Sequence, residues 1–139
     1  MVELLIGKKG TGKTKALIEK VNNALTVAKG NVVFISNDTN RNIFDVKSKA
    51  RMADTSEFEI KSYDEFLGFI CGIVSQDYDL QEMYLDSFLT TACIKDNLDY
   101  AVEKLDALSE KFGVSFVISA SVDKENMPES VQKYVSHAL

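Results

Sequence analysis

The chain lacks several features on which whole classes of protein depend. Only one of its 139 residues is histidine and two are cysteine, which excludes a histidine-based catalytic triad and a zinc cluster. No apolar run approaches the length that crosses a bilayer. The apolar stretch at the N-terminus is also too short for a signal peptide. We therefore expect a cytoplasmic protein that does not bind a membrane.

Arginine is scarce as well, because all but two of the sixteen basic residues are lysines. Small-molecule phosphotransferases usually hold the transferring phosphate with several arginines, so this class is disfavoured. The net charge of −5 argues against nucleic acid as the main ligand. We interpret Arg41 and Arg51 as solvated surface charges, with contact to a nucleotide, including one bound by a neighbouring subunit, as the alternative.

Length and composition indicate a single domain that spans residues 1–139. A chain of this length buries a proper core, and its hydrophobic content of 45% is typical of a globular protein. Cys71 and Cys93 both lie in apolar surroundings. We expect them to be reduced residues of the core.

One motif at the N-terminus is specific. Residues 7–14 complete the pattern G-x-x-x-x-G-K-[ST] between a short apolar run and a helical pattern, the context in which a backbone loop wraps a phosphate. Lys13 would reach the β- and γ-phosphate oxygens, and the Thr14 hydroxyl would hold Mg²⁺. We predict that ATP with Mg²⁺ is bound by Gly7, Lys8, Lys9, Gly10, Thr11, Gly12, Lys13 and Thr14. The side chains of Lys8 and Lys9 either add positive potential there or, as we favour, face solvent.

Apolar runs and helical patterns alternate along the rest of the chain. Strands are predicted at 2–6, 32–35, 58–61, 80–85 and 114–118. Helices are predicted at 13–28, 62–74, from Asp96 or Asn97 to Phe112, and after Pro128, with Gly30 in a left-handed conformation after the first. This order predicts a three-layer α/β fold with a mostly parallel sheet of about five strands and helices on both faces. Ligands of such sheets bind at the carboxyl ends of the strands.

The stretch from residue 40 to residue 57 has the weakest pattern. Ile43, Phe44 and Val46 are compatible with a short helix, and residues 51–57 are interpreted as a loop. The role of this stretch stays open on the sequence alone.

Three polar residues follow predicted strands and are therefore site candidates. Asp86 follows the strand 80–85 and is the candidate second holder of Mg²⁺, with a helix-capping aspartate as the alternative. Asp38 is placed to orient an attacking water, unless it is an ordinary turn residue that leaves the strand. Ser119 is a candidate for hydrogen bonding to the γ-phosphate or its water, although serine is common at such positions.

These pieces resemble, in their order, the RecA-like division of P-loop NTPases, especially the ATPase core of replicative ring helicases. The resemblance covers about residues 1–122 and rests on 7–14, 32–38, 83–86 and 116–119. It implies that Asp38 matches a catalytic position that is usually glutamate. It likewise implies that Asp86 is the aspartate associated with Mg²⁺ and that Ser119 is a polar γ-phosphate sensor.

The resemblance also implies a strand order and shows departures. The strand 2–6 is expected beside 114–118, with 80–85 next and 32–35 beyond. Aspartate replaces glutamate at residue 38, residue 87 is serine instead of a second acid, and no arginine follows Ser119. The later strands and DNA-binding loops of larger relatives have no counterpart here. The strand 2–6 is therefore expected near a sheet edge, open to a partner or a covering C-terminal helix.

Three functions remain open on these observations. The first is a small ATPase that hydrolyses slowly, stimulated by a protein partner or by homo-oligomer formation. The second is a nucleotide-sensing adaptor that binds without turnover, in which the aspartate at residue 38 reflects lost catalysis. The third is a small-molecule kinase, which scarce arginine disfavours. A GTPase is less favoured still, because the chain has no [NT]-K-x-D motif.

Overall fold

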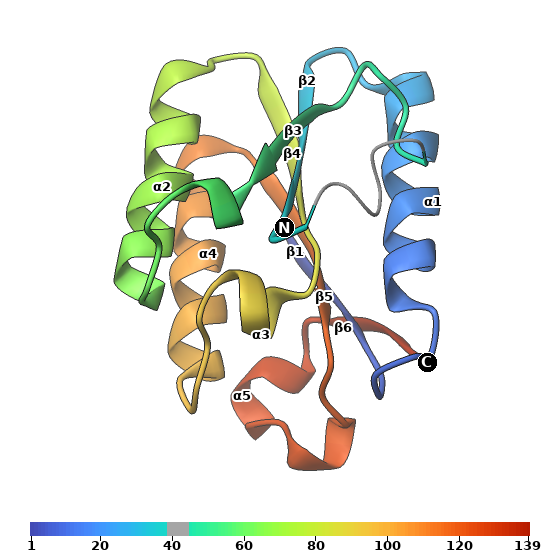
Figure 1. Cartoon of the computed structure of the whole chain (residues 1–139), viewed down its shortest axis with the longest axis vertical. Helices are drawn as coiled ribbons and strands as arrows, with labels where there is room; N and C mark the ends of the chain where they lie inside the picture. Colours follow the sequence, from blue (N-terminus) through green and yellow to red (C-terminus); the bar gives the residue numbers. More distant parts are fainter. Residues whose placement is uncertain (39–44) are drawn as a thin grey trace.

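Six short strands form one sheet in which every neighbouring pair is parallel (Figure 1). The computed structural model describes residues 1–38 and 45–139. The sheet order is β3-β2-β4-β5-β1-β6. The strands are β1 (Val2–Ile6), β2 (Asn31–Ser36), β3 (Arg51–Asp54), β4 (Leu80–Leu85), β5 (Ser115–Ala120) and β6 (Val135–Ala138). The order expected for the four central strands is confirmed.

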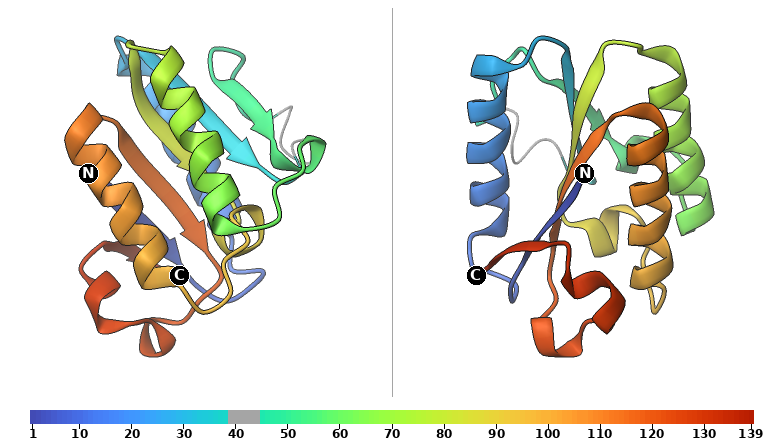
Figure 2. Two further views of the ribbon diagram at one scale, coloured as in Figure 1. Left: turned by 90° about the vertical axis from the view of Figure 1, so that its left-hand side faces the viewer. Right: turned by 180° about the vertical axis from the view of Figure 1, so that it is seen from behind.

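Helices cover both faces of the sheet, so the predicted three-layer α/β fold is confirmed, with six strands in place of about five. The helices are α1 (Lys13–Val27), α2 (Tyr63–Gln76), α3 (Phe88–Thr91), α4 (Leu98–Phe112) and α5 (Glu129–Gln132). Figures 1 and 2 show α1 alone on one face and α2 with α4 on the other. Leu17 and Val21 of α1 pack against Phe34 of β2, while Phe66 and Ile70 of α2 belong to the larger core on the opposite face.

Local sequence signals explain the start of α2 and the end of α4. The Ser62 hydroxyl accepts a hydrogen bond from the Glu65 amide at 3.2 Å and caps α2. Gly113 ends α4 with φ of 70°, a left-handed conformation that favours glycine. Gly30, by contrast, does not have the predicted left-handed conformation. It permits a close approach instead, because a Cβ atom there would lie 2.1 Å from the Asp79 carbonyl oxygen.

The stretch between β2 and α2 differs most from expectation. Residues 51–57 are not a loop: they form edge strand β3 and a 3₁₀ turn, Thr55–Glu57. Residues 58–61 are not a strand, because local turns use the amides of Phe58 and Ile60, which donate to Thr55 and Phe58 carbonyls. The Phe58 ring instead lies 5.4 Å from that of Phe69.

Several other expectations on single residues need correction or lie outside the structure. Val46 is buried in the cluster that includes α1, whereas Arg41, Ile43 and Phe44 lie outside the described residues. Both thiols are free, but Cys71 is exposed on α2 and Cys93 is half-buried, so neither is a core residue.

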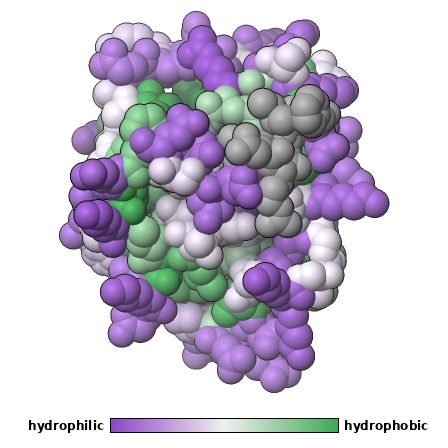
Figure 3. Space-filling view, viewed as in Figure 1, coloured by the Kyte–Doolittle hydropathy of each residue, from purple (hydrophilic) through white to green (hydrophobic). Residues whose placement is uncertain are grey.

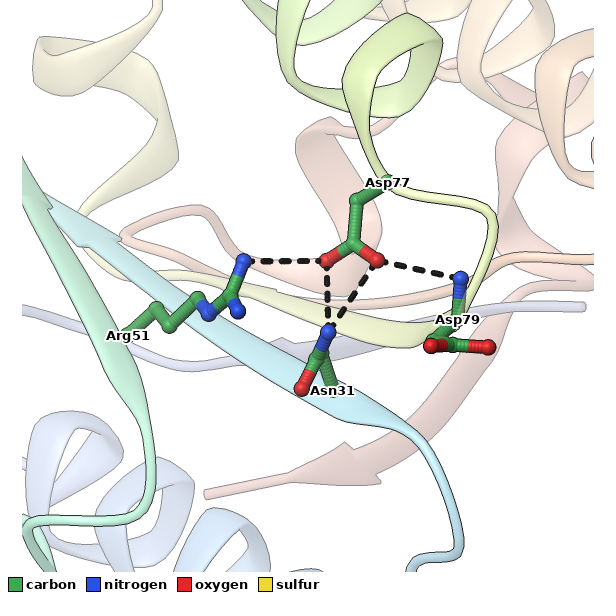
Figure 4. Close-up of polar contacts among 4 residues, drawn as sticks. All are labelled: Asn31, Arg51, Asp77 and Asp79. Carbon is green, nitrogen blue, oxygen red and sulfur yellow. Dashed lines mark hydrogen bonds and ion pairs between the residues drawn. The ribbon is translucent and has the colours of Figure 1, made fainter.

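The carboxylate of Asp77 ties together three elements at the amino ends of the strands (Figure 4). It accepts a hydrogen bond from the side-chain amide of Asn31 at 2.9 Å and another from the backbone amide of Asp79 at 3.0 Å. It also forms an ion pair with Arg51 at 3.3 Å. Arg51 is thus the exposed surface charge that we favoured, and it lies at the end of the sheet opposite the loop 7–14. An open hollow of about 550 Å³ lies between β3 and α2, lined mainly by apolar side chains. On the face seen in Figure 3, apolar patches alternate with polar and charged side chains.

The edge of the sheet beside β1 is covered by strand β6 and not by the expected helix. Pro128 precedes the short helix α5 as predicted, and the chain then turns back to run parallel to β1. No helix in the described ranges, 1–38 and 45–139, has both the length and the apolar character to cross a membrane.

Candidate phosphate-binding site

The loop between β1 and α1 has the backbone conformation that its glycines predict. Gly10 and Gly12 have φ of 85° and 88°, a region that other residues rarely adopt. A Cβ atom on either glycine would meet nothing within 4 Å, so packing does not require glycine there. The Thr11 amide and hydroxyl both bond to the Lys8 carbonyl, at 3.3 Å and 2.7 Å. The two glycines are therefore needed for the left-handed backbone conformation that curves the loop.

Lys13 is the buried cation of this loop. It is the first residue of α1, only 8% of it is exposed, and its ammonium donates to the Lys8 carbonyl at 2.7 Å. Burial lowers the pKa of Lys13 below its ordinary value of 10.5, and the charge of Asp86 partly offsets that effect. The side chains of Lys8 and Lys9 are exposed, as we favoured.

Thr14, Asp86 and Ser119 meet at the carboxyl ends of the strands. The Thr14 hydroxyl lies 3.0 Å and 3.3 Å from the two carboxylate oxygens of Asp86. The Ser119 hydroxyl donates to Asp86 Oδ1 at 2.8 Å and accepts from the Ser87 amide at 2.9 Å. Asp86 is only 3% exposed. One hydroxyl from helix α1 and one from strand β5 therefore orient a single buried carboxylate.

The backbone around Asp86 fixes this orientation. Its amide donates to the Ile35 carbonyl at 2.9 Å, and its carbonyl accepts from the Thr91 hydroxyl at 2.8 Å. Ser87 then adopts φ of 49°, an uncommon conformation for a residue with a side chain, and precedes the short helix α3. The Asp86 carboxylate faces Thr14 and Ser119, which favours the predicted site role over the helix-capping alternative. Sequence reasoning missed Thr91, because a threonine inside a short helical segment gives no distinguishing signal.

A cavity of about 550 Å³ opens over the loop. It is lined by Lys9, Gly10, Gly12, Lys13, Thr14, Ser87, Leu89, Thr90, Ser119 and Ser121. Gly7, Lys8 and Thr11 of the predicted loop are not among these lining residues. The cavity thus combines the predicted loop with a wall of hydroxyl groups, of which only Ser119 was a candidate from the sequence.

Asp38 does not join this group. It lies two residues beyond β2, and its amide donates to the Ser36 hydroxyl at 3.1 Å, a local turn contact. It is not among the residues that line the cavity. The turn interpretation of Asp38 accounts for this geometry, and its catalytic role stays a prediction.

The donor set fits a hard cation such as Mg²⁺. Magnesium binds proteins through one or two oxygen groups and completes its shell with water and phosphate oxygens. Thr14 and Asp86 supply a hydroxyl and a carboxylate already in contact. Across residues 1–38 and 45–139, no three acidic, histidine or cysteine side chains gather into a cage that would hold a metal alone. A cation held by Thr14 and Asp86 would complete its shell with water or phosphate oxygens.

Comparisons with known proteins support the fold. No model of a known protein family matches the chain. No curated protein matches it in sequence. Among solved structures it is similar to a KaiC-like protein of the hyperthermophilic archaeon Pyrococcus horikoshii, with a TM-score of 0.63 and 17% identity. The match covers 96% of this chain and 66% of the archaeal chain, so the chain spans just under two thirds of that protein. At this identity the likeness shows the fold alone, which the chain shares with that KaiC-like protein.

Proposed function

We propose that this protein binds ATP with Mg²⁺ in the cavity over residues 7–14 and hydrolyses it slowly. The observation that carries the proposal is the contact between Thr14 and Asp86, which joins the phosphate loop to the carboxyl end of β4. A phosphate loop that served only as a turn would need no buried carboxylate beside its threonine. The fold supports the same conclusion, because the loop 7–14 follows the carboxyl end of the parallel strand β1, and ligands of such sheets bind at that end.

Each residue of the site has a distinct part in this proposal. The backbone amides of residues 7–14 surround the phosphates, and the Lys13 ammonium leaves the Lys8 carbonyl to neutralise phosphate charge. Thr14 and Asp86 hold Mg²⁺, which supplies charge neutralisation across the β- and γ-phosphates. Ser119 keeps the Asp86 carboxylate in place, so a direct contact with the γ-phosphate is no longer its main expected role. We propose turnover in the cytoplasm, raised by a protein partner or by homo-oligomer formation.

One observation favours a second candidate, a nucleotide-sensing adaptor without turnover. Asp38 is the candidate for orienting water, yet its backbone forms a turn and it does not line the cavity. The two functions differ in phosphate release and in the effect of Asp38→Asn. If the protein is an ATPase, Asp38→Asn should slow phosphate release. If it is an adaptor without turnover, the same variant should leave every measured activity unchanged.

Calorimetric titration with ATP and GTP, with and without Mg²⁺, tests the common part of both functions. Binding of ATP should require Lys13 and should weaken without Mg²⁺, so Lys13→Ala abolishes binding and Asp86→Asn removes the dependence on Mg²⁺. Lys15→Ala is the matched control, because Lys15 lies on the same helix and is exposed. Equal binding by Lys13→Ala and Lys15→Ala would overturn the proposal.

A further inference from the structure

The strand β6 ends against the first glycine of the phosphate loop. Residues 135–139, which we call the strap, run parallel to β1, with a break in register between Leu4 and Leu5. At the end of the strap, the Leu139 amide donates to the Ile6 carbonyl at 2.8 Å. Ile6 is the last residue of β1, so this hydrogen bond fixes the point from which the loop departs.

Gly7 is enclosed between the strap and the loop. A Cβ atom on Gly7 would lie 2.8 Å from the backbone oxygen of Leu139, 3.2 Å from its Cβ atom and 2.7 Å from Thr11 Oγ1. Contacts below 3 Å force a neighbour to move. Leu139 and the loop residue Thr11 therefore both border the space that a Cβ atom of Gly7 would fill.

The strap is held weakly along its own length and firmly at its start. Val135 is half-buried and residues 136–139 are exposed. Just before the strap, Val131 is fully buried, and the Tyr134 hydroxyl donates to Asp106 at 2.8 Å. Exposed segments open locally at lower free energy than the core, so we expect the strap to detach from β1 while α5 stays in place.

We propose that Leu139 is a positioning residue for the phosphate loop, so that docking of the strap and binding of a nucleoside triphosphate favour each other. This inference rests on the proposed function for its ligand. With the strap docked, the loop already has Gly10 and Gly12 in left-handed conformations beneath an open cavity. Detachment releases Ile6 and Gly7 and allows the loop more conformations. The docked state is thus the state prepared for phosphate, and the coupling is reciprocal.

Two variants at one position isolate the hydrogen bond. Leu139→Pro removes the amide that donates to Ile6 and keeps an apolar side chain, whereas Leu139→Ala keeps both the amide and the Cβ atom beside Gly7. We expect Leu139→Pro to weaken ATP binding about threefold to tenfold, the effect of one backbone hydrogen bond. Leu139→Ala should bind within about twofold of the unmodified chain, because half of the Leu139 surface is exposed.

Amide hydrogen exchange supplies a readout that loss of overall stability does not produce. Without nucleotide, the Thr11 amide should exchange faster in Leu139→Pro than in Leu139→Ala. In the unmodified chain, ATP with Mg²⁺ should slow exchange at Leu139 as well as in the loop. The Ala28 amide, which bonds to Ala24 at the far end of α1, is the control and should not change.

The results separate this inference from the proposed function. If ATP slows exchange in the loop and leaves Leu139 unchanged, or if both variants bind ATP equally, the strap does not position the loop. If the unmodified chain binds no ATP, the proposed function fails, and the nucleotide-free exchange at Thr11 still decides the inference. Equal Thr11 exchange in both variants overturns it. If Leu139→Pro does not fold, the effect of ATP on amide exchange at Leu139 in the unmodified chain decides the inference alone.

Discussion

Replacing Ser119 by alanine tests whether this serine supports Asp86 or contacts the nucleotide. The Ser119 hydroxyl is 1% exposed, donates to the Asp86 carboxylate at 2.8 Å and accepts from the Ser87 amide at 2.9 Å. A hydrogen bond to a charged group contributes about 1.5 to 3 kcal/mol and a neutral one about 1 kcal/mol. Ser119→Ala should therefore lower the free energy of unfolding by about 3 kcal/mol, because it removes both bonds.

Urea unfolding at neutral pH, followed by circular dichroism, measures this loss. Ser121→Ala is the matched control, because Ser121 lines the same cavity, is exposed, and forms no hydrogen bond with any residue of the described ranges. That control should stay within about 0.5 kcal/mol of the unmodified protein. The same Ser119 variant should also weaken the dependence of ATP binding on Mg²⁺, since the Asp86 carboxylate is then held by Thr14 alone among its hydroxyl donors.

Two results would refute this reasoning. The first is a loss of stability in Ser119→Ala no larger than in Ser121→Ala, which would mean that the two buried hydrogen bonds contribute nothing net. The second is unchanged stability together with lost discrimination between ATP and ADP. That pattern belongs to a side chain that contacts the γ-phosphate, the role implied by the family resemblance.

Two further predictions concern a glycine and the loop lysine. Gly30→Ala should destabilise the protein by about 1–3 kcal/mol in thermal or urea unfolding, because the new Cβ atom would overlap the Asp79 carbonyl. Gly72→Ala on α2 should stabilise the protein by about 0.5–1 kcal/mol, because the new Cβ atom would meet open space. This reasoning is wrong if both variants are stabilised or both are destabilised. ATP affinity should fall with rising pH before the ordinary lysine pKa of 10.5 is reached, because burial lowers the pKa of Lys13 and phosphate binding needs its charged form. Calorimetry on Lys13→Arg, which stays charged, should show no such fall.

The sequence predicted best where a local pattern is strong enough to determine the structure by itself. The glycines of residues 7–14 impose a backbone conformation, and the periodic apolar residues of α1 and α4 each bury one face. The strand order followed from the resemblance and is confirmed for the four central strands. For the loop and the two helices, neighbouring residues carry the information, whereas the strand order was available only from the resemblance.

The prediction failed where distant residues decide the structure. The strand β3 has no alternating pattern, and it forms because Arg51 pairs with Asp77 and the strand pairs with β2. The strand β6 is polar and exposed, so nothing in its own composition indicates a strand. Residues 58–61 alternate as a strand would, yet the Phe58 ring packs at a tilt against the Phe69 ring, and local turns use the backbone amides of this segment.

At the candidate site, the sequence identified the groups but not their partners. Lys13, Thr14, Asp86 and Ser119 were all named, and the structure brings them to one end of the sheet. That the Ser119 hydroxyl bonds to Asp86 depends on the register between β4 and β5, which no local pattern specifies. Thr91 was missed because a threonine in a short helical segment gives no distinguishing signal, and Leu139 was missed because its contact with Ile6 joins opposite ends of the sequence.

The position of β1 in the sheet has a consequence for biosynthesis. The strand β1 is synthesised before its two neighbours in the sheet, β5 and β6. Val2 therefore cannot pair with Phe116, nor Leu4 with Val135, until those later residues have been made. During translation the phosphate loop emerges early on an unpaired apolar strand. It reaches its final shape only when β5 and β6 have left the ribosome. Long-range parallel pairing of this kind is slow, so under the proposed function nucleotide would bind the finished domain and not its first half.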